Sequence, residues 1–540
     1  MVRAVRLSVF SLVLCLSALM LTPSQRTRLY AQSASLGSVP QVFRPVGFAL
    51  SAAVRDLPDV APGGLNAGEI DGEDEPLREV KNRQLPKGGV EDGEQRIDPA
   101  VQPDIPTLLS STPAATLSTD GLSSQDNFNA FGGRVLPPDT NGDVGPNHYV
   151  QTVNLLFRVY NKSGAPLTPP TKMSSLFTPL GGVCSVNDNG DPIVLYDPLA
   201  DRWLLSQFAF TAPSGLAPPY HQCVALSRTG DPTGSYFLYD FVMPNANFND
   251  YPHFGVWPDG YYMTDNQFLN GGPFNGAGLF AFDRTKMLTG DPTASYIYIT
   301  LPNDGGMLPA DLDGLNPPPP GAPNLIAEFT SSLFGDPIDG MKIFEFHADF
   351  GNPAASTVTL RPESPIPVAA FDPRKPAGRN VIEQPAPALS TMYLDAIQDR
   401  LMFRLAYRNF GSHESLVVTH TVNVSGVAPT APALHQAGVR YYEFQRSGGA
   451  FSVAEQATFA PGAGNGATGD NRWMGSAAQD ASGNLVVGYS VSGTGTPPQS
   501  RTQAGSRPIR RTGSSRAKRR WFSAPASSAA HRDDGATIAR

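Results

Sequence analysis

The chain has 540 residues, a formal net charge of −8 and only 16% charged residues, while glycine (53) and proline (52) together make up about a fifth of it. This composition excludes a mainly helical protein, because so many turn-forming residues suit short strands joined by tight turns. The basic residues concentrate near the C-terminus, so the chain as a whole is not suited to specific nucleic-acid binding.

The first 31 residues have the pattern of a secretory signal peptide. Arg3 and Arg6 form a positive start, residues 7–21 are apolar, and Ala31 offers a small residue at a cleavage point. The apolar run is shorter than the roughly 20 residues that span a bilayer. We therefore expect residues 1–31 to be removed, leaving no transmembrane segment and a secreted protein, extracellular or periplasmic.

Residues 32–125 show little hydrophobic periodicity. Acidic clusters at residues 69–75 and 91–94 lie among scattered prolines and glycines. Such a segment buries too little apolar surface to offset the entropy lost on ordering. The composition predicts a disordered, acidic leader over residues 32–125.

From residue 126 the sequence consists of apolar runs of about five to eight residues bounded by turn residues, a pattern that is typical of strands. No stretch keeps an apolar period of 3.6 residues over three turns, so we predict an all-β domain over residues 126–495. The expected strands include residues 149–154, 155–160, 191–197, 201–210, 222–227, 235–241, 255–264, 278–283, 295–300, 342–346, 401–407, 415–421, 440–444 and 485–490.

A weak internal repeat supports a β-propeller. Asp197, Asp201 and Arg202 recur as Asp395, Asp399 and Arg400, each set preceding a strand and each interpreted as a turn-stabilising ion pair. Repeated hairpins without a linker-like break favour one closed propeller with blades of about 40–50 residues, and about six or seven blades would fit. Tandem β-sandwiches are the alternative, because regular strand spacing suits both folds.

Asp139, Asn141 and Asp143 place oxygen ligands at alternating positions, as in a loop that wraps Ca²⁺. Val144 and Val150 stand where an EF-hand needs glycine and glutamate, so the segment is not an EF-hand. An Asx-rich turn whose side chains bond their own backbone is the alternative to calcium. Residues 188–191 form a similar, weaker candidate.

Cysteine usage predicts one disulfide. Cys15 falls in the signal peptide, which leaves Cys184 and Cys223 as an even pair in an oxidising compartment. Closing a loop of about 40 residues contributes about 3–4 kcal/mol in the chain-entropy model. Two unpaired buried thiols are the alternative.

No catalytic motif stands out. The histidines do not form a zinc motif, and the Asp197/Asp201 carboxylates, although a pair could serve glycoside hydrolysis, fit the turn interpretation better. Aromatic side chains could line a sugar-binding face, but we expect them to pack in the core. These histidines are four of the chain's eight, His148, His221, His253 and His347; the aromatic residues in question are Trp203, Trp257, Trp473, Tyr261, Tyr262, Tyr441 and Tyr442.

Three motifs resemble a family of uncharacterised secreted bacterial proteins. They are Pro-Pro-Asp-Thr-Asn-Gly-Asp-Val-Gly-Pro-Asn-His-Tyr-Val at residues 137–150, the block of residues 184–203 with Asp-Pro-Ile-Val-Leu-Tyr-Asp, and Asp-Tyr-Pro-His-Phe-Gly-Val-Trp-Pro-Asp-Gly-Tyr-Tyr at residues 250–262. The resemblance covers roughly residues 137–492. It implies export and a propeller-like fold, and it brings no catalytic residues.

The C-terminal stretch departs from this family. Residues 496–540 are rich first in arginine and then in alanine and serine. At this point the members of the family that the chain resembles continue with further strands. We interpret this as a disordered basic tail produced by a reading-frame shift near Gly495. A genuine tail that binds a polyanion is the alternative.

These observations predict a secreted, non-enzymatic binding or adhesion module with an extracellular glycan or protein ligand on its loops. The alternative is an extracellular hydrolase or lyase that acts on glycans with carboxylates at the propeller's centre. No cofactor is expected apart from the candidate calcium ion, and the oligomeric state is left open.

Overall fold

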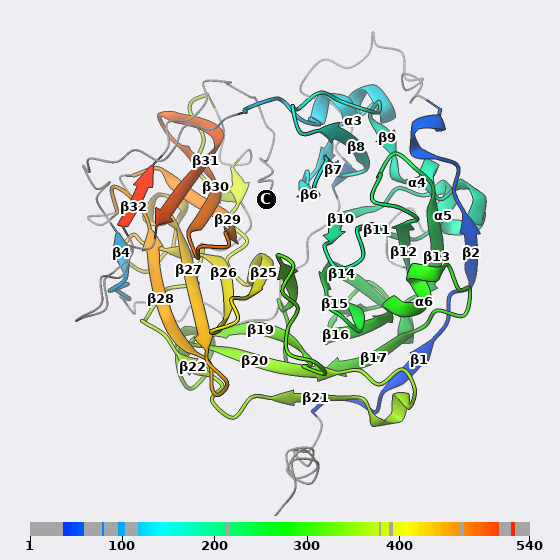
Figure 1. Ribbon diagram of the computed structural model, residues 1–540. Helices are drawn as coiled ribbons and strands as arrows, with labels where there is room; N and C mark the ends of the chain where they lie inside the picture. The colour runs from blue at the N-terminus through cyan, green and yellow to red at the C-terminus, as the bar shows by residue number, and fades with distance from the viewer. Residues whose placement is uncertain are drawn as a thin grey trace, which may run out of the picture.

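The computed structural model describes residues 36–58, 78–79, 95–102, 117–211, 217–376, 380–387, 393–463, 469–506 and 520–523. The protein is all-β, with about 10% helix, and its sheets have a propeller-like arrangement around a common centre. Figure 1 shows strands β6, β10, β14, β25 and β29 nearest to that centre. The expected signal peptide lies outside the described residues.

Four sheets have the size of a propeller blade. Their strands are β6 (Asn141–Val144), β7 (His148–Val153), β8 (Leu156–Asn161) and β9 (Thr171–Lys172); β10 (Gly190–Asp197), β11 (Arg202–Ala209), β12 (His221–Ser227), β13 (Tyr236–Val242) and β2 (Gly47–Leu50); β14 (Asn247–Val256), β15 (Gly260–Leu269), β16 (Phe274–Asp283), β17 (Tyr296–Leu301) and β1 (Gln41–Phe43); and β29 (Asn471–Gln479), β30 (Leu485–Gly493), β31 (Thr496–Ser506) and β32 (Arg520–Ser523). Within each, neighbouring strands are antiparallel, as short hairpin connections require.

A fifth sheet is ten-stranded. It contains β18 (Leu308–Asp313), β19 (Asn324–Thr330), β20 (Gly340–His347), β21 (Thr357–Leu360), β22 (Ile366–Pro367), β25 (Met402–Asn409), β26 (Glu414–Asn423), β27 (Ala437–Arg446), β28 (Ser452–Phe459) and β4 (Val101–Gln102). Strands β18 and β25 pair in parallel, from Ala310 opposite Leu405 to Asp313 opposite Arg408. Because this pairing joins two groups of strands into one sheet, the expected count of six or seven blades is not confirmed.

Short elements complete the described structure. Strand β3 (Arg78–Glu79) pairs with β5 (Val135–Leu136), and β23 (Asn380–Ile382) pairs with β24 (Leu394–Asp395). The α-helices are α3 (Ser124–Phe131), α4 (Met173–Leu176), α5 (Gly182–Val186) and α6 (Arg284–Thr289). Helix α3 begins with a capping box between Ser123 and Asp126. Among the described residues, none of these helices combines the length and apolar character needed to cross a membrane.

Aromatic side chains fill the space between adjacent sheets. Phe241 of β13 meets Phe282 of β16, in the neighbouring sheet, with ring centroids 5.1 Å apart, and Phe254 of β14 meets the same ring from within its own sheet at 5.4 Å. The aromatic residues weighed as a sugar-binding face are buried instead, with Trp203 and Tyr262 at 0% exposure and Trp257 at 1%. The expectation that they pack in the core is confirmed. Each such side chain contributes about 1.5–3 kcal/mol through burial.

The N-terminal segment differs from the predicted disordered leader. Strand β2 pairs with β13 and β1 pairs with β17, so each extends the outer edge of a blade-sized sheet (Figure 1). Strand β4 likewise pairs with the edge strand β28. The unpaired backbone groups of edge strands bind any extended segment that reaches them. The prediction of disorder was based on the average composition of residues 32–125. That average does not reveal short segments such as β1, β2 and β4, which pair with the edges of sheets.

The start of the predicted tail is also ordered. Residues 496–506 form β31, which pairs with β30 from Leu485 opposite Gly505 to Gly493 opposite Thr496. The fold therefore continues past Gly495, the expected boundary. The frame-shift hypothesis stays a prediction.

Candidate functional site

Three aspartates from consecutive parts of the fold form one cluster of carboxyl groups. Asp139 lies two residues before β6, Asp191 lies at the start of β10, and Asp250 lies in β14. The charges of Asp139 and Asp250 both act on the Asp191 carboxyl group. Strands β6, β10 and β14 stand side by side near the centre in Figure 1. Asp191 and Asp250 lie in β10 and β14, and Asp139 lies in the segment that leads into β6.

The backbone is strained where it presents these groups. Asp139, Asp191 and Tyr251 have φ angles of 38°, 46° and 58°, in the left-handed region that non-glycine residues avoid. Register shifts interrupt β10 between Gly190 and Ile193, and β14 between Asp250 and His253. Such irregularities redirect side chains and cluster at functional sites.

The carboxyl groups of Asp139 and Asp191 act directly on each other. Burial raises the pKa of Asp191 well above its ordinary value, and the neighbouring charges of Asp139 and Asp250 raise it further. The Tyr251 N–H donates to Asp191 Oδ2 over 3.2 Å, which opposes this rise but does not cancel it. Of the groups in the cluster, the Asp191 carboxyl group is thus one whose protonated form is favoured by its surroundings.

A buried cation, the Arg400 guanidinium, lies close enough to the cluster for the Asp250 charge to act on it. Arg400 is 2% exposed and binds Asp399 through Nε at 2.8 Å and Nη2 at 3.1 Å. Its guanidinium lies over the Tyr251 ring, 4.9 Å from the centroid, and the Asp250 charge helps to raise its pKa. Asp250 thus has a fixed positive charge nearby, which favours its ionised form.

His253 is neutral in this setting. Its ring lies 4.0 Å from that of Tyr251 and 4.8 Å from that of Phe403, centroid to centroid. Burial, aided by the Arg400 charge, lowers the pKa of His253 to about 3. Neither ring nitrogen has a hydrogen-bond partner among the described residues. The cluster therefore brings together the carboxyl groups of Asp139, Asp191 and Asp250 and the Arg400 guanidinium. These are groups that acid–base catalysis uses.

The predicted calcium ligands have other partners in the structure. Asn141 Oδ1 accepts the N–H of Val194 over 2.9 Å, and Asp143 Oδ2 accepts the N–H of Tyr196 over 2.7 Å. These two side chains therefore tie β6 to β10, while Asp139 belongs to the carboxylate cluster. Calcium binding by the three residues stays a prediction.

The two copies of the Asp/Arg repeat are built differently. In the first, buried Asp197 binds Arg284 at 2.7 Å and caps the following turn by accepting the N–H groups of Leu199 and Ala200. Asp201 accepts the Tyr196 hydroxyl over 2.7 Å, and Arg202 donates to backbone oxygens.

In the second copy, Asp399 and Arg400 pair directly, whereas Asp395 lies 3.9 Å from the Lys375 ammonium. The interpretation as one shared ion pair therefore describes only the second copy.

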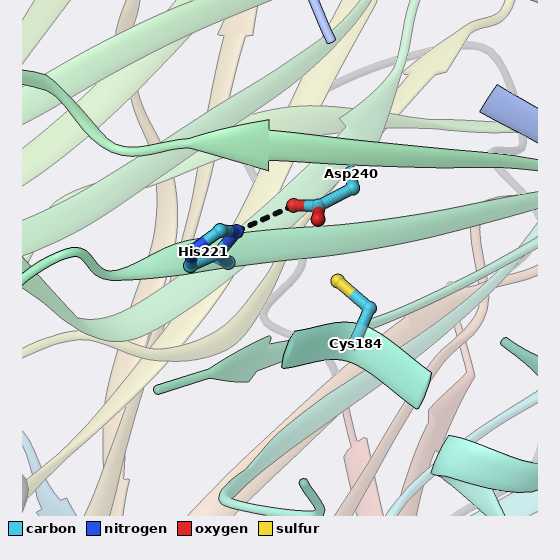
Figure 2. A group of neighbouring side chains, drawn as sticks. All are labelled: Cys184, His221 and Asp240. Atoms are coloured by element: carbon cyan, nitrogen blue, oxygen red, sulfur yellow. Dashed lines mark hydrogen bonds and ion pairs between the residues drawn. The ribbon is translucent and has the colours of Figure 1, made fainter. Parts of the chain in front are cut away.

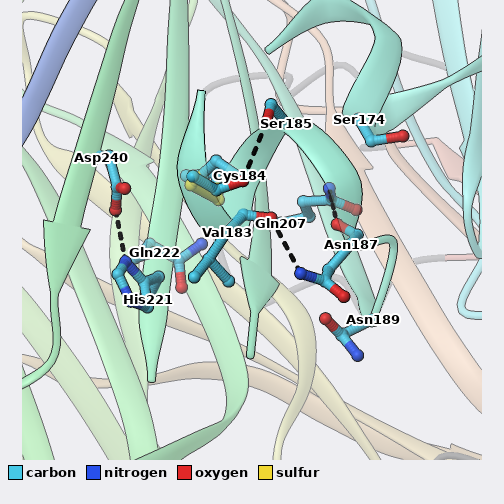
Figure 3. The surroundings of a disulfide bond; sticks show 12 residues. Ser174, Val183, Cys184, Ser185, Asn187, Asn189, Gln207, His221, Gln222 and Asp240 are labelled. Atoms are coloured by element: carbon cyan, nitrogen blue, oxygen red, sulfur yellow. Dashed lines mark hydrogen bonds and ion pairs between the residues drawn. A yellow bond between two sulfur atoms is a disulfide. The ribbon is translucent and has the colours of Figure 1, made fainter. Parts of the chain in front are cut away.

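The predicted disulfide is present. Cys184 of α5 and Cys223 of β12 are bonded, with Cα atoms 5.8 Å apart. Both are fully buried, and the disulfide pins α5 to the face of the sheet (Figure 3). The prediction from the even cysteine count is confirmed.

Beside the disulfide lies a buried histidine–aspartate pair, His221 Nδ1 and Asp240 Oδ1, 2.6 Å apart (Figure 2). With Cys184 they form a group whose potential metal-binding atoms lie within 4.8 Å of one another. The Cys184 sulfur is committed to the disulfide, so it is not a thiolate and the group lacks its strongest ligand.

The four histidines noted in the sequence lie on four different strands. His148 begins β7, His221 lies on β12, His253 on β14 and His347 ends β20.

Sequence reasoning missed Asp250 and the meeting of the three aspartates. Asp139 and Asp191 each fell in a candidate calcium turn, but nothing linked the two turns. A usable signal did exist: each of the three aspartates lies near the start of the first strand of a four-strand group. In a propeller those positions converge on the axis.

No protein-family model and no curated protein matches this chain. Among solved structures, a GH43 endo-arabinanase from Bacillus licheniformis is similar, with 8% identity, a TM-score of 0.27, and coverage of 68% of this chain and 93% of that one. A PL25 ulvan lyase has 9% identity, a TM-score of 0.30, and coverage of 68% and 82%. A protein of unknown function from Dyadobacter fermentans DSM 18053 has 11% identity, a TM-score of 0.31, and coverage of 68% and 92%.

This comparison corrects one expectation. The sequence suggested a non-enzymatic binding or adhesion module, whereas the similar structures with a named activity are carbohydrate-active enzymes. Their identities and TM-scores are too low to carry an activity, a substrate or a residue role to this chain.

Proposed function

We propose that the protein is an extracellular carbohydrate-active enzyme, a glycan hydrolase or lyase, with its active site at Asp139, Asp191 and Asp250. The observation that carries this proposal is the meeting of three aspartates from neighbouring sheets, where burial and the charges of Asp139 and Asp250 raise the pKa of Asp191. A carboxylic acid that stays protonated next to ionised carboxylates is what proton donation to a glycosidic oxygen requires.

The roles are assigned from the contacts within the cluster. Glycosidic cleavage needs an acid and a second carboxylate on opposite sides of the scissile bond, about 5–9.5 Å apart. Asp139 and Asp191 are in direct hydrogen-bond contact, so no sugar fits between them. Asp191 is therefore assigned as the acid and Asp250 as the second carboxylate. Asp139 is assigned as the ionised partner that keeps the proton on Asp191.

In a hydrolysis, Asp191 gives its proton to the glycosidic oxygen as the C–O bond breaks. A water molecule, which loses a proton to Asp250, adds to the sugar carbon. In a lyase reaction on a uronic acid, Asp250 would instead take a proton from the carbon next to the carboxylate, and Asp191 would protonate the leaving oxygen. Both reactions use Asp191 as the proton donor, and their products distinguish a hydrolase from a lyase.

The test is a screen of the purified protein against neutral and uronic-acid-containing polysaccharides. Reducing ends without ultraviolet absorption indicate hydrolysis, and an unsaturated product that absorbs indicates a lyase. Asp191→Asn and Asp250→Asn should each reduce turnover by about 10²-fold or more. Absence of turnover on every polysaccharide would overturn the proposal.

Asp188→Asn is the matched control. Asp188 is also buried with a raised pKa, but its carboxyl group is bonded to Ser174 and Gln207 and lies outside the cluster. The asparagine keeps an acceptor for the Ser174 N–H, so this variant should retain wild-type turnover. Loss of turnover in this variant as well would point to general damage rather than lost acid–base chemistry.

We further propose that the ten-stranded sheet represents two blades, β18–β21 and β25–β28, whose first strands pair with each other. With the four blade-sized sheets this makes a six-bladed propeller. Secretion, the signal peptide and membership of the secreted bacterial family belong to the same proposal. Amino-terminal sequencing of the exported protein, expected to start at Gln32, tests the export step.

A further inference from the structure

We propose that reduction of the Cys184–Cys223 disulfide creates a zinc site, in which the two cysteine sulfurs, His221 and Asp240 bind one Zn²⁺. In the oxidised protein the two sulfurs are bonded to each other, so neither is a thiolate that binds a metal. The site is separate from the carboxylate cluster, and this inference does not depend on the proposed enzymatic activity.

The sheet itself brings three of the four ligands together. His221 and Cys223 are two residues apart on β12, so their side chains lie on the same face of the sheet. Asp240 of β13 stands directly opposite Cys223 in the antiparallel pairing. Residues opposed in this way have Cβ atoms about 4.5–5.5 Å apart. Strand pairing therefore holds these three side chains together whether or not the disulfide is formed.

Helix α5 supplies the fourth ligand. Figure 2 shows the Cys184 sulfur pointing from α5 toward His221 and Asp240. One potential ligand atom from each of these three residues lies within 4.8 Å of the other two. Zinc bonds of about 2.0–2.3 Å in a tetrahedral site place the ligand atoms roughly 3.3–3.8 Å apart. A side chain released from the disulfide closes this difference by moving about 1 Å.

The chemistry and burial of the four residues suit a structural zinc ion. Two thiolates, an imidazole and a carboxylate complete a four-coordinate site without a water molecule. Cys184 and Cys223 are 0% exposed, and His221 and Asp240 are each 6% exposed. The His221 Nδ1 atom contacts Asp240, whereas its buried Nε2 atom has no hydrogen-bond partner among the described residues. No second hydrogen bond therefore fixes the imidazole ring, which is free to turn toward a metal ion.

The exchange of the disulfide for zinc is balanced. Two electrons and two protons convert the disulfide into two thiols, while a dithiol reductant is oxidised to its own disulfide. Zinc then displaces the two thiol protons and binds the thiolates. The covalent link between α5 and β12 is thereby replaced by a metal link between the same two elements.

The experiment uses Co²⁺ as the probe, because it occupies tetrahedral zinc sites and absorbs visible light, whereas Zn²⁺ does not. The full chain carries Cys15→Ser, so that only Cys184 and Cys223 supply thiols. It is reduced with a dithiol, which is then removed in the absence of oxygen. One equivalent of Co²⁺ should give a thiolate-to-cobalt charge-transfer band that one equivalent of Zn²⁺ abolishes. The oxidised chain should give no such band.

His221→Gln and Asp240→Asn test the two ligands that are not cysteines. Each should weaken Co²⁺ binding by the reduced chain by at least about 10–100-fold, the loss that even changes in the outer shell of a metal site cause. His347→Gln is the control, because this histidine is exposed on β20, and it should bind Co²⁺ as the wild type does. Wild-type affinity in both ligand variants would reduce the site to two thiols and overturn the inference.

A second measurement needs no substitution at the ligands. Zn²⁺ should raise the melting temperature of the reduced chain and leave that of the oxidised chain unchanged, because only the reduced folded state has the site. Chelation should reverse the rise. A reduced chain whose melting temperature does not respond to Zn²⁺, or which gives no thiolate-to-cobalt band, would also overturn the inference.

Discussion

Asp98 and Arg440 form a buried ion pair, with Asp98 Oδ1 and Arg440 Nη1 2.8 Å apart and the two side chains 1% and 0% exposed. Asp98 belongs to the N-terminal segment beside β4, whereas Arg440 lies on β27, 342 residues later. The Arg440 guanidinium also donates to the Ala369 oxygen over 2.9 Å and to Gln456 Oε1 over 2.7 Å. The segment that precedes the main domain is thus bound to its interior.

Asp98→Ala should destabilise the protein by about 3–5 kcal/mol, because it leaves the Arg440 charge buried without its counter-ion. Denaturant unfolding monitored by tryptophan fluorescence measures the change. Arg55→Ala is the control, since its pair with Asp231 has side chains 56% and 45% exposed and should contribute less than about 1 kcal/mol. Equal effects of the two substitutions would contradict the buried anchoring of the N-terminal segment.

The disulfide should contribute about 4 kcal/mol to stability, from the loop that it closes across 39 residues of sequence separation. The double variant Cys184→Ser and Cys223→Ser should show this loss in its denaturation midpoint. A reducing agent should lower the stability of the wild type by a similar amount and leave the double variant unchanged. A reductant effect that is the same in both proteins would show that the disulfide is not its source.

His253 should make the protein acid-sensitive. Its pKa is about 3 in the folded state, against about 6.5 in the unfolded chain, so the unfolded state binds the extra proton between these values. The contribution of His253 is complete above pH 6.5 and is lost as the pH falls, by about 1.4 kcal/mol per pH unit. Folding free energies measured across this range test the slope.

His253→Phe should flatten this slope, because phenylalanine fills the space between Tyr251 and Phe403 without titrating. The exposed His347, replaced in the same way, is the control and should leave the slope as it is. If His253→Phe keeps the wild-type slope, a different group controls acid unfolding.

Local features of the sequence predicted much of the fold. Apolar runs bounded by turn residues identified the strands, and an even cysteine count identified the bond between Cys184 and Cys223. These signals are contained within one strand or follow from counting. The parallel pairing of β18 with β25 depends on how two distant strands meet, so the blade count did not follow from the sequence.

The sequence predicted only part of the candidate site, because the site also depends on how distant strands meet. Asp139 and Asp191 were singled out, each within its own turn, because acidic residues among glycines are a local pattern. Asp250 was missed because its place in the cluster depends on Asp191, which lies on another sheet. Contacts between distant strands have no signature in a single sequence.

The central claim is that Asp191 donates a proton to the glycosidic oxygen. The most direct test is the pH dependence of kcat/KM on the polysaccharide that the screen identifies. Turnover by the wild type should fall as the pH rises through the raised pKa of Asp191, because the acid is then ionised. Asp191→Asn should lose about 10²-fold or more and show no such fall. An Asp191→Asn variant with the wild-type rate and the same pH profile would contradict the claim.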